Sequence, residues 1–140
     1  MADAKFTEIT YDSETGGTIY SDVDLSFKAH PVTGDILTTK NATVIKQSMR
    51  NVLQTREFER IGHPEIGSKL QDLLFDPMNN ITETRLKISI QTTMQSLEPR
   101  AAIRDIQVLS EEDHNRYRVK IIFSMMGQQT SETFEQFLYR

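Results

Sequence analysis

The sequence of 140 residues contains no cysteine and no tryptophan. Without cysteine the chain has no disulfide, no thiolate nucleophile and no cysteine-ligated zinc. It also lacks a run of apolar residues long enough to span a bilayer, and residues 1–5 lack the apolar core of a signal peptide. The formal net charge of −4 argues against nucleic acid as the main partner. We therefore expect neither a nucleic-acid-binding nor a membrane protein.

Catalytic and ligand-binding motifs are equally scarce. His30, His63 and His114 lie far apart, each beside a turn, with no second histidine or acid at metal-ligand spacing. The chain has no glycine-rich phosphate loop and no serine nucleophile elbow, so we expect no metal and no cofactor. A carboxylate pair for glycoside hydrolysis, such as Glu59 with Glu65 or Glu98, can be nominated. Nothing in the sequence marks one of these acids as buried and protonated.

The strongest helical pattern lies in residues 80–97. Four apolar residues fall on one stripe of this helix: Leu86, Ile90, Met94 and Leu97. We expect Asn80 to cap its first turn, with Glu83 in the capping-box position. Pro99 ends the helix, because it has no N–H to donate and disfavours helical geometry at the residue before it. The corner Glu98–Pro99–Arg100 then leads into a β-rich segment. It is either a docking point or an ordinary helix stop flanked by solvated charges.

The part of the chain before this helix predicts an arm, a short strand and two helices. Residues 1–18 are polar and are expected to form an extended N-terminal arm. Residues 19–27 alternate as a half-buried extended segment whose apolar positions are Val23, Leu25 and Phe27, and residues 31–35 form a turn. A helix from Asn41 or Thr43 to about Thr55 buries Ile45, Met49, Val52 and Leu53. A charged loop over residues 56–64 follows, and a short helix over residues 66–75 buries Leu70, Leu73, Leu74 and Phe75.

The part after the helix predicts antiparallel strands. Ile106 and Val108 alternate in one strand, and Tyr117, Val119, Ile121 and Phe123 alternate in the clearest strand of the chain. Residues 130–139 fit a helix stripe as well as a strand, and the preceding hairpin favours the strand. We therefore predict an α+β fold, with two to three helices packed on a small three-stranded antiparallel sheet. The predicted organisation is the arm over residues 1–18 and a single domain over residues 19–140.

Residues 43–125 resemble the small baseplate wedge protein of contractile-tailed phages, a family shared with type VI secretion baseplates. The resemblance is carried by Ile45–Ser48, Val52–Leu53 and Thr55–Arg56 in the first helix, by Glu59–Arg60 and Pro64–Gly67 in the loop, and by Leu70, Leu74–Phe75 and Glu98–Pro99–Arg100. The sequence departs from the family at Phe58, where the family usually has glycine before the Glu-Arg pair. A loop that needs a positive φ would be strained by phenylalanine.

The resemblance implies a structural role in a contractile-tail baseplate rather than an enzyme. Its implied partners are the helical core of the wedge, the tail sheath protein, and tube or hub proteins. Docking on the core is assigned to Glu98, Pro99, Arg100, Glu59 and Arg60, with Glu98 and Arg100 displayed at the surface. The sheath would start from an open sheet edge, for which we nominate Thr130, Ser131, Glu132, Thr133 and Phe134. It implies a virion baseplate made in the host cytoplasm, or the cytoplasmic baseplate of a secretion system. Because some members of the family were once labelled lysozyme-like, a peptidoglycan-cleaving enzyme remains the alternative.

Overall fold

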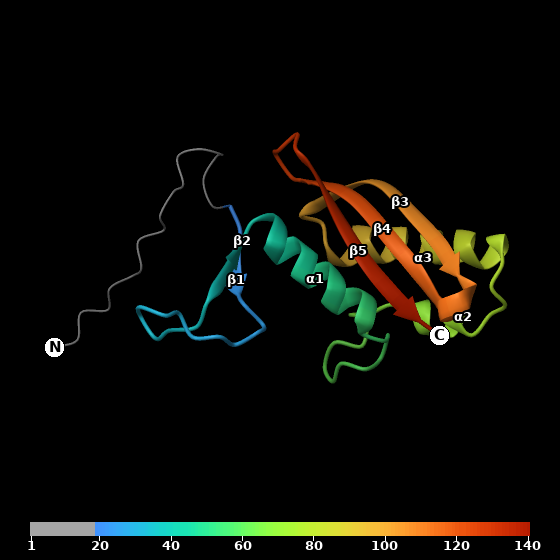
Figure 1. The fold of residues 1–140 in the computed structure, drawn as a ribbon, viewed down its shortest axis with the longest axis horizontal. Coiled ribbons are helices and arrows are strands. Elements are labelled where there is room, and N and C mark those ends of the chain that lie inside the picture. The colour runs from blue at the N-terminus through green and yellow to red at the C-terminus, as the bar shows by residue number, and fades with distance from the viewer. Residues whose placement is uncertain (1–18) are drawn as a thin grey trace. The chain divides into compact units, whose positions relative to one another are not determined.

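The computed structural model describes residues 19–140, and the predicted arm over residues 1–18 lies outside them. Residue contacts divide the chain into two compact units, the first ending at Val44 and the second running from Ile45 to Arg140. The single domain expected over residues 19–140 stays a prediction. In chain order the elements are β1 (Ser21–Val23), β2 (Thr38–Lys40), α1 (Ala42–Gln54), α2 (Leu70–Leu74), α3 (Asn80–Leu97), β3 (Ala101–Glu111), a 3-10 turn (Glu112–His114), β4 (Arg116–Met125) and β5 (Ser131–Tyr139) (Figure 1).

The first unit contains a short antiparallel ribbon in which β1 pairs with β2. Asn41 closes its open end, because its side-chain oxygen accepts hydrogen bonds from the N–H groups of Ile19 and Tyr20. The half-buried strand predicted for residues 19–27 is wrong, since β1 has three exposed residues and Phe27 is 69% exposed. Two strands alone have too little surface to bury one face.

The helices α1 and α3 form where the apolar stripes predict them. Ile45, Met49 and Leu53 of α1 are buried, and so are Leu86, Ile90 and Met94 of α3. The predicted cap of α3 is wrong by one residue: the N-cap is Asn79, whose Oδ1 accepts from the Thr82 N–H at 2.8 Å. Glu83 is therefore not part of a capping box, and its carboxylate instead accepts a hydrogen bond from the Ser110 N–H at 2.8 Å.

The second helix is shorter than predicted. Gly67 has a φ of +151°, which is not a helical conformation, and it lies inside residues 66–75, where a helix was expected. Residues up to Lys69 therefore remain irregular, and α2 begins at Leu70. Leu70 and Leu74 are buried as expected, but Phe75 lies at the end of the helix and is 72% exposed. The prediction that Phe75 joins the core is wrong.

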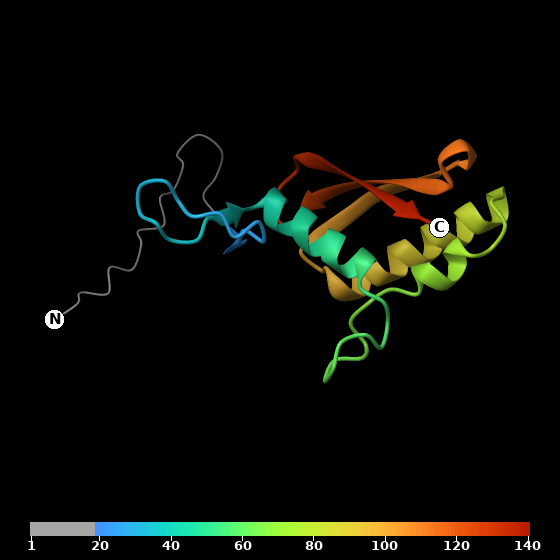
Figure 2. The ribbon, with the colours of Figure 1, turned by 60° about the horizontal axis from the view of Figure 1, so that its bottom comes forward.

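The second unit is built on an antiparallel sheet with the strand order β3-β4-β5. The odd-numbered residues of β4 from Tyr117 to Phe123 are fully buried, and Phe134 and Leu138 of β5 pair with Ile121 and Tyr117 on the same face. Within this unit the helices lie along one face of the sheet (Figure 2). Residues 131–139 form a strand, which confirms the preferred interpretation, and the predicted α+β fold is also confirmed.

None of the helices within residues 19–140 combines the length and the apolar character that crossing a bilayer requires.

Candidate functional site

The corner after α3 is fixed by hydrogen bonds on both sides of Pro99. The Glu98 N–H donates to the Met94 carbonyl at 2.9 Å, which completes the last turn of the helix. The Ala101 N–H donates to the Glu98 carbonyl at 3.1 Å, and the Met126 N–H donates to the Arg100 carbonyl at 3.0 Å. The backbone of the corner therefore joins the end of α3 to the start of β3 and to the end of β4.

The side chains of Glu98 and Arg100 form a bidentate ion pair inside this corner. Arg100 Nε donates to Glu98 Oε1 at 2.5 Å, and Nη2 donates to Oε2 at 2.7 Å. The Glu98 side chain is 1% exposed, whereas the Arg100 side chain is 35% exposed. Such paired, charge-assisted hydrogen bonds are among the strong ones in proteins. The pair fixes the orientation of the Arg100 guanidinium relative to the corner.

This geometry corrects the expectation that Glu98 and Arg100 are both displayed at the surface. Glu98 is buried, and its two oxygens are occupied by Arg100, because a carboxylate that enters the interior needs a charged partner. Pro99 is exposed and Arg100 is partly exposed, so these two residues are what the corner presents to another molecule.

The loop after α1 is held as a closed turn by three backbone hydrogen bonds. The Ser68 N–H donates to the Thr55 carbonyl, the Glu57 N–H donates to the Ser68 carbonyl, and the Phe58 N–H donates to the Pro64 carbonyl. A Cβ atom at Gly67 would lie 2.6 Å from the carbonyl carbon of Arg56, so only glycine allows the two sides of the loop to approach this closely.

Phe58, the departure from the family pattern, adopts the left-handed conformation. Its φ is +69° and its side chain is 77% exposed. The loop thus keeps a conformation that suits glycine although phenylalanine occupies the position. The neighbouring Ile61 is also fully exposed. The side chain of Arg60 is exposed and forms no ion pair within residues 19–140.

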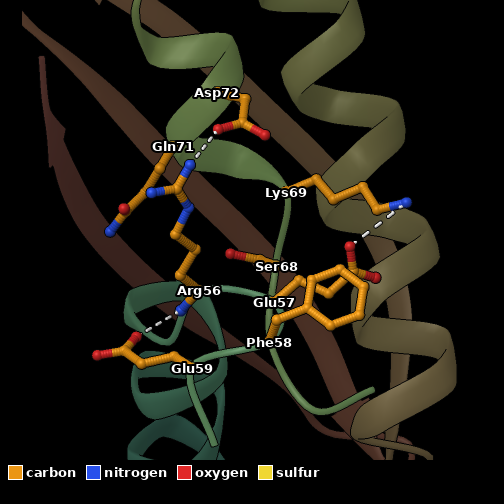
Figure 3. Close-up of a pocket in the computed structure, with 8 residues that line it drawn as sticks. All are labelled: Arg56, Glu57, Phe58, Glu59, Ser68, Lys69, Gln71 and Asp72. Atoms are coloured by element: carbon orange, nitrogen blue, oxygen red, sulfur yellow. Dashed lines mark hydrogen bonds and ion pairs between the residues drawn. The ribbon is translucent and has the colours of Figure 1, made fainter. Parts of the chain in front are cut away.

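A depression of about 650 Å³ lies between this loop and α2. Figure 3 shows that its charged side chains are engaged with one another: Arg56 pairs with Asp72 at 2.8 Å, and Lys69 pairs with Glu57 at 3.4 Å. The carboxylate of Glu59 accepts a hydrogen bond from the Arg56 N–H at 2.9 Å. This arrangement stabilises the loop, and its acids already have partners.

The three acids nominated for hydrolysis have environments that do not favour a general acid. Glu98 has both oxygens bound by Arg100. The pKa of Glu65 is lowered, first by its own backbone N–H and then by the hydrogen bond with His63, whereas a general acid needs a raised pKa. Among residues 19–140, no group of three or more histidine, aspartate and glutamate side chains is placed to hold a metal ion.

The nominated sheath-binding residues lie at the start of β5, which is an edge strand. Thr130 precedes the strand, and Ser131 and Thr133 are exposed. Glu132 and Phe134 face the helices instead: Glu132 pairs with Lys46 of α1 at 2.8 Å, and Phe134 is 3% exposed. Only part of the nominated segment is therefore open to a partner.

The sequence reasoning missed a charged cluster on the uncovered face of the sheet. The guanidinium of Arg116 lies 4.1 Å from the ring centroid of Phe137, and that of Arg118 lies 5.5 Å from it. Both arginines pair with Glu111, at 2.6 and 2.5 Å. The available signal was the spacing of two residues between the arginines, which places both on one face of a strand.

Solved structures with this fold include chains of baseplate assemblies. A chain of the anti-feeding prophage baseplate superposes with a TM-score of 0.67 at 21% identity, over 79% of this chain and 88% of that one. A chain of the postcontracted pyocin R2 baseplate gives 0.52 at 16% identity, over 86% and 99%. A candidate tail lysozyme of Geobacter sulfurreducens gives 0.65 at 21% identity, over 69% and 88%.

The sequence comparisons name the family. The family model described as baseplate wedge protein gp25 matches residues 39–130, which is more than half of the chain. The chain belongs to this family. It is 29% identical over 108 residues to baseplate wedge protein gp25 of Enterobacteria phage T4, covering 77% of this chain and 81% of that protein. It is therefore a structural component of a contractile-tail baseplate, as the resemblance implied.

Proposed function

We propose that this chain docks on other wedge proteins through the corner after α3 and the loop after α1, and that the tail sheath starts from the edge of β5. The single observation that carries the sheath proposal is the unpaired backbone of β5. Tube or hub proteins are further proposed partners, and assembly in the host cytoplasm is the proposed setting. The following geometry supports the proposal.

Hydrogen-bond directions identify which groups of β5 face outward. Alternate residues of an antiparallel strand bond to opposite neighbours. On β3, the N–H groups of Ile106 and Ser110 donate to side chains rather than to β4, so the alternate residues Gln107 and Leu109 bond to Lys120 and Arg118 of β4. It follows from the register that Val119 and Ile121 bond to Gln136 and Phe134 of β5.

The residues of β5 that point away from β4 are therefore the odd-numbered ones. By this register the N–H groups of Thr133 and Glu135 point away from β4, toward the open side of the sheet. A row of such groups is a template for a strand of another chain. Pairing through the backbone requires no particular side chain, so one protein can begin a lattice made of copies of another.

Proline at Thr133 tests this edge. Thr133→Pro removes an outward N–H and leaves the hydrogen bonds between β4 and β5 in place. We expect baseplates that assemble normally but carry few extended sheaths in electron micrographs. Thr133→Val, which keeps the N–H, is the matched control and should carry sheaths at the parental frequency. Normal sheath frequency on baseplates of a folded Thr133→Pro variant, with circular dichroism equal to that of the parent, would refute the proposal.

The docking proposal concentrates on three side chains: Pro99, the exposed part of Arg100, and Arg60. Arg60 offers the sharpest test, because its unpaired guanidinium contributes little to the stability of the isolated chain. If it binds a partner carboxylate, Arg60→Ala should weaken binding to the wedge proteins by about 2 kcal/mol, which is roughly 30-fold. Arg85→Ala is the control, because it removes an exposed arginine that lies on α3, away from the loop. Equal recovery of both variants in pull-downs would exclude Arg60 from docking.

The enzymatic alternative has a direct test. Glu59→Gln changes one nominated acid without disturbing the buried pair of Glu98. We expect neither the parent nor this variant to release peptidoglycan fragments above a buffer control. Turnover by the parent that disappears in a folded Glu59→Gln variant would support a hydrolase instead.

A further inference from the structure

The two edges of the sheet differ in their hydrogen bonding. On β3, the Ser110 N–H donates to Oε1 of Glu83 on α3, and the Ile106 N–H donates to Oδ1 of Asp105, each at 2.8 Å. Ile106 and Ser110 are four residues apart, so their N–H groups point to the same side of the strand. These two carboxylates therefore occupy the outer edge of β3, where an added strand would have to bond.

Further contacts fix the Asp105 carboxylate in place. Lys87, one turn after Glu83 on α3, lies 3.6 Å from Asp105, and the side-chain amide of Gln107 donates to the other oxygen of Asp105 at 3.1 Å. The space between α3 and this edge is a depression of about 330 Å³ that both carboxylates border. Between the two capped groups, the Val108 N–H points to the same outer side of β3.

A β-bulge between Ile103 and Asp105 interrupts the other end of the same strand. A bulge inserts an extra residue and twists the strand, so it disrupts the regular spacing that an added strand needs. Together the bulge and the two carboxylates leave no two adjacent N–H groups free along this stretch of the outer edge of β3. The edge of β5 has neither feature: its ladder to β4 is regular from Arg116 to Ser124, and by this register the N–H groups of Thr133 and Glu135 point outward.

We propose that Glu83 and Asp105 close the β3 edge to strand addition, so that the sheet pairs with another chain only through β5. A sheet with two open edges can pair head to tail, β5 of one copy on β3 of the next, and such a heterologous contact grows without limit. A sheet with one open edge can pair once. The closure of β3 thus prevents this chain from polymerising on itself and keeps β5 for its partner.

The closure of β3 stands on its own geometry, and only the identity of the strand that pairs with β5 rests on the proposed function. The two therefore fail in different experiments. Loss of sheath growth in Thr133→Pro concerns β5, whereas the tests below concern β3 and use the purified full chain alone.

The first test compares two double variants that remove the same charge. Glu83→Ala with Asp105→Ala removes both acceptors, whereas Glu83→Gln with Asp105→Asn keeps an acceptor oxygen at each position. In sedimentation velocity, we expect the alanine double variant to form species larger than a dimer as its concentration rises. The amide double variant and the parent should not exceed a dimer. A folded alanine double variant that also stays at or below the dimer would overturn the proposal.

The second test needs no substitution and covers the case in which the alanine variant does not fold. Amide hydrogen exchange of the parent reports whether each N–H at this edge has an acceptor. Because hydrogen bonds to charged acceptors are strong, the Ser110 and Ile106 amides should exchange about tenfold more slowly than the Val108 amide between them. Equal exchange at the three positions would mean that the carboxylates do not close the edge.

Discussion

Removal of Arg100 should destabilise the chain strongly, because it leaves the buried carboxylate of Glu98 without a partner. Breaking a buried ion pair by truncating one member costs roughly 3–5 kcal/mol. Since the Arg100 side chain is 35% exposed, water compensates in part, and we expect Arg100→Ala to cost about 3 kcal/mol. That is a large share of the roughly 5–15 kcal/mol that holds a domain folded. The corresponding fall in Tm is roughly 10 °C.

Thermal and urea unfolding at neutral pH measure this loss, and two further variants isolate its cause. Glu98→Gln in the Arg100→Ala background removes the unpaired charge and should recover at least half of the lost stability. Arg85→Ala removes an exposed arginine that lies 3.5 Å from Asp76, and should cost less than about 1 kcal/mol. An Arg100→Ala variant that unfolds at the parental temperature would refute the reasoning. Failure of Glu98→Gln to rescue would show that the loss comes from packing rather than charge.

Two smaller effects follow from the loop and the uncovered sheet face. Phe58→Gly relieves a left-handed conformation that costs about 1–2 kcal/mol. Glycine also makes the unfolded chain more flexible, which lowers the stability of the fold by about 0.5–1 kcal/mol. Tm should therefore rise slightly, and a lower Tm would show that the exposed ring contributes to the fold. The pKa of Glu111 is lowered below 4.5, first by Arg116 and then by Arg118, so the cluster stabilises the fold above this pH and the contribution is lost as the pH falls through the lowered value. The difference in urea stability between the parent and Arg116→Ala should therefore shrink on acidification, and a constant difference would contradict the assignment.

Elements that bury one face were predictable from periodicity alone. The stripe of Ile45 and Met49 predicted α1, that of Leu86 and Ile90 predicted α3, and the alternation from Tyr117 predicted β4, because each pattern matches the geometry of a single element. Residues 130–139 were ambiguous for the same reason, since their aromatic residues fit the spacing of a helix as well as that of a strand. The register with β4 decides between them: it turns Phe134 inward and leaves Phe137 on the opposite face, beneath Arg116.

The features that sequence reasoning missed depend on partners elsewhere in the chain. The sequence spacing alone predicted that Glu83 belongs to a capping box. Its carboxylate instead accepts a hydrogen bond from Ser110, which lies 27 residues later in the chain. The burial of Glu98 could not be predicted either. A glutamate two residues before an arginine is usually solvated, and no local pattern marks this one as 1% exposed.

The hydrogen-bonded corner also has a mechanical consequence. Because Glu98 and Arg100 join the end of α3 directly to the start of β3, a load applied to the corner enters β3 along the axis of the strand. β3 pairs with β4 from Ala101 to Glu111, and its hydrogen bonds lie across the strands. A pull along the axis therefore loads the whole ladder in shear, so that many rungs must break together rather than open one by one.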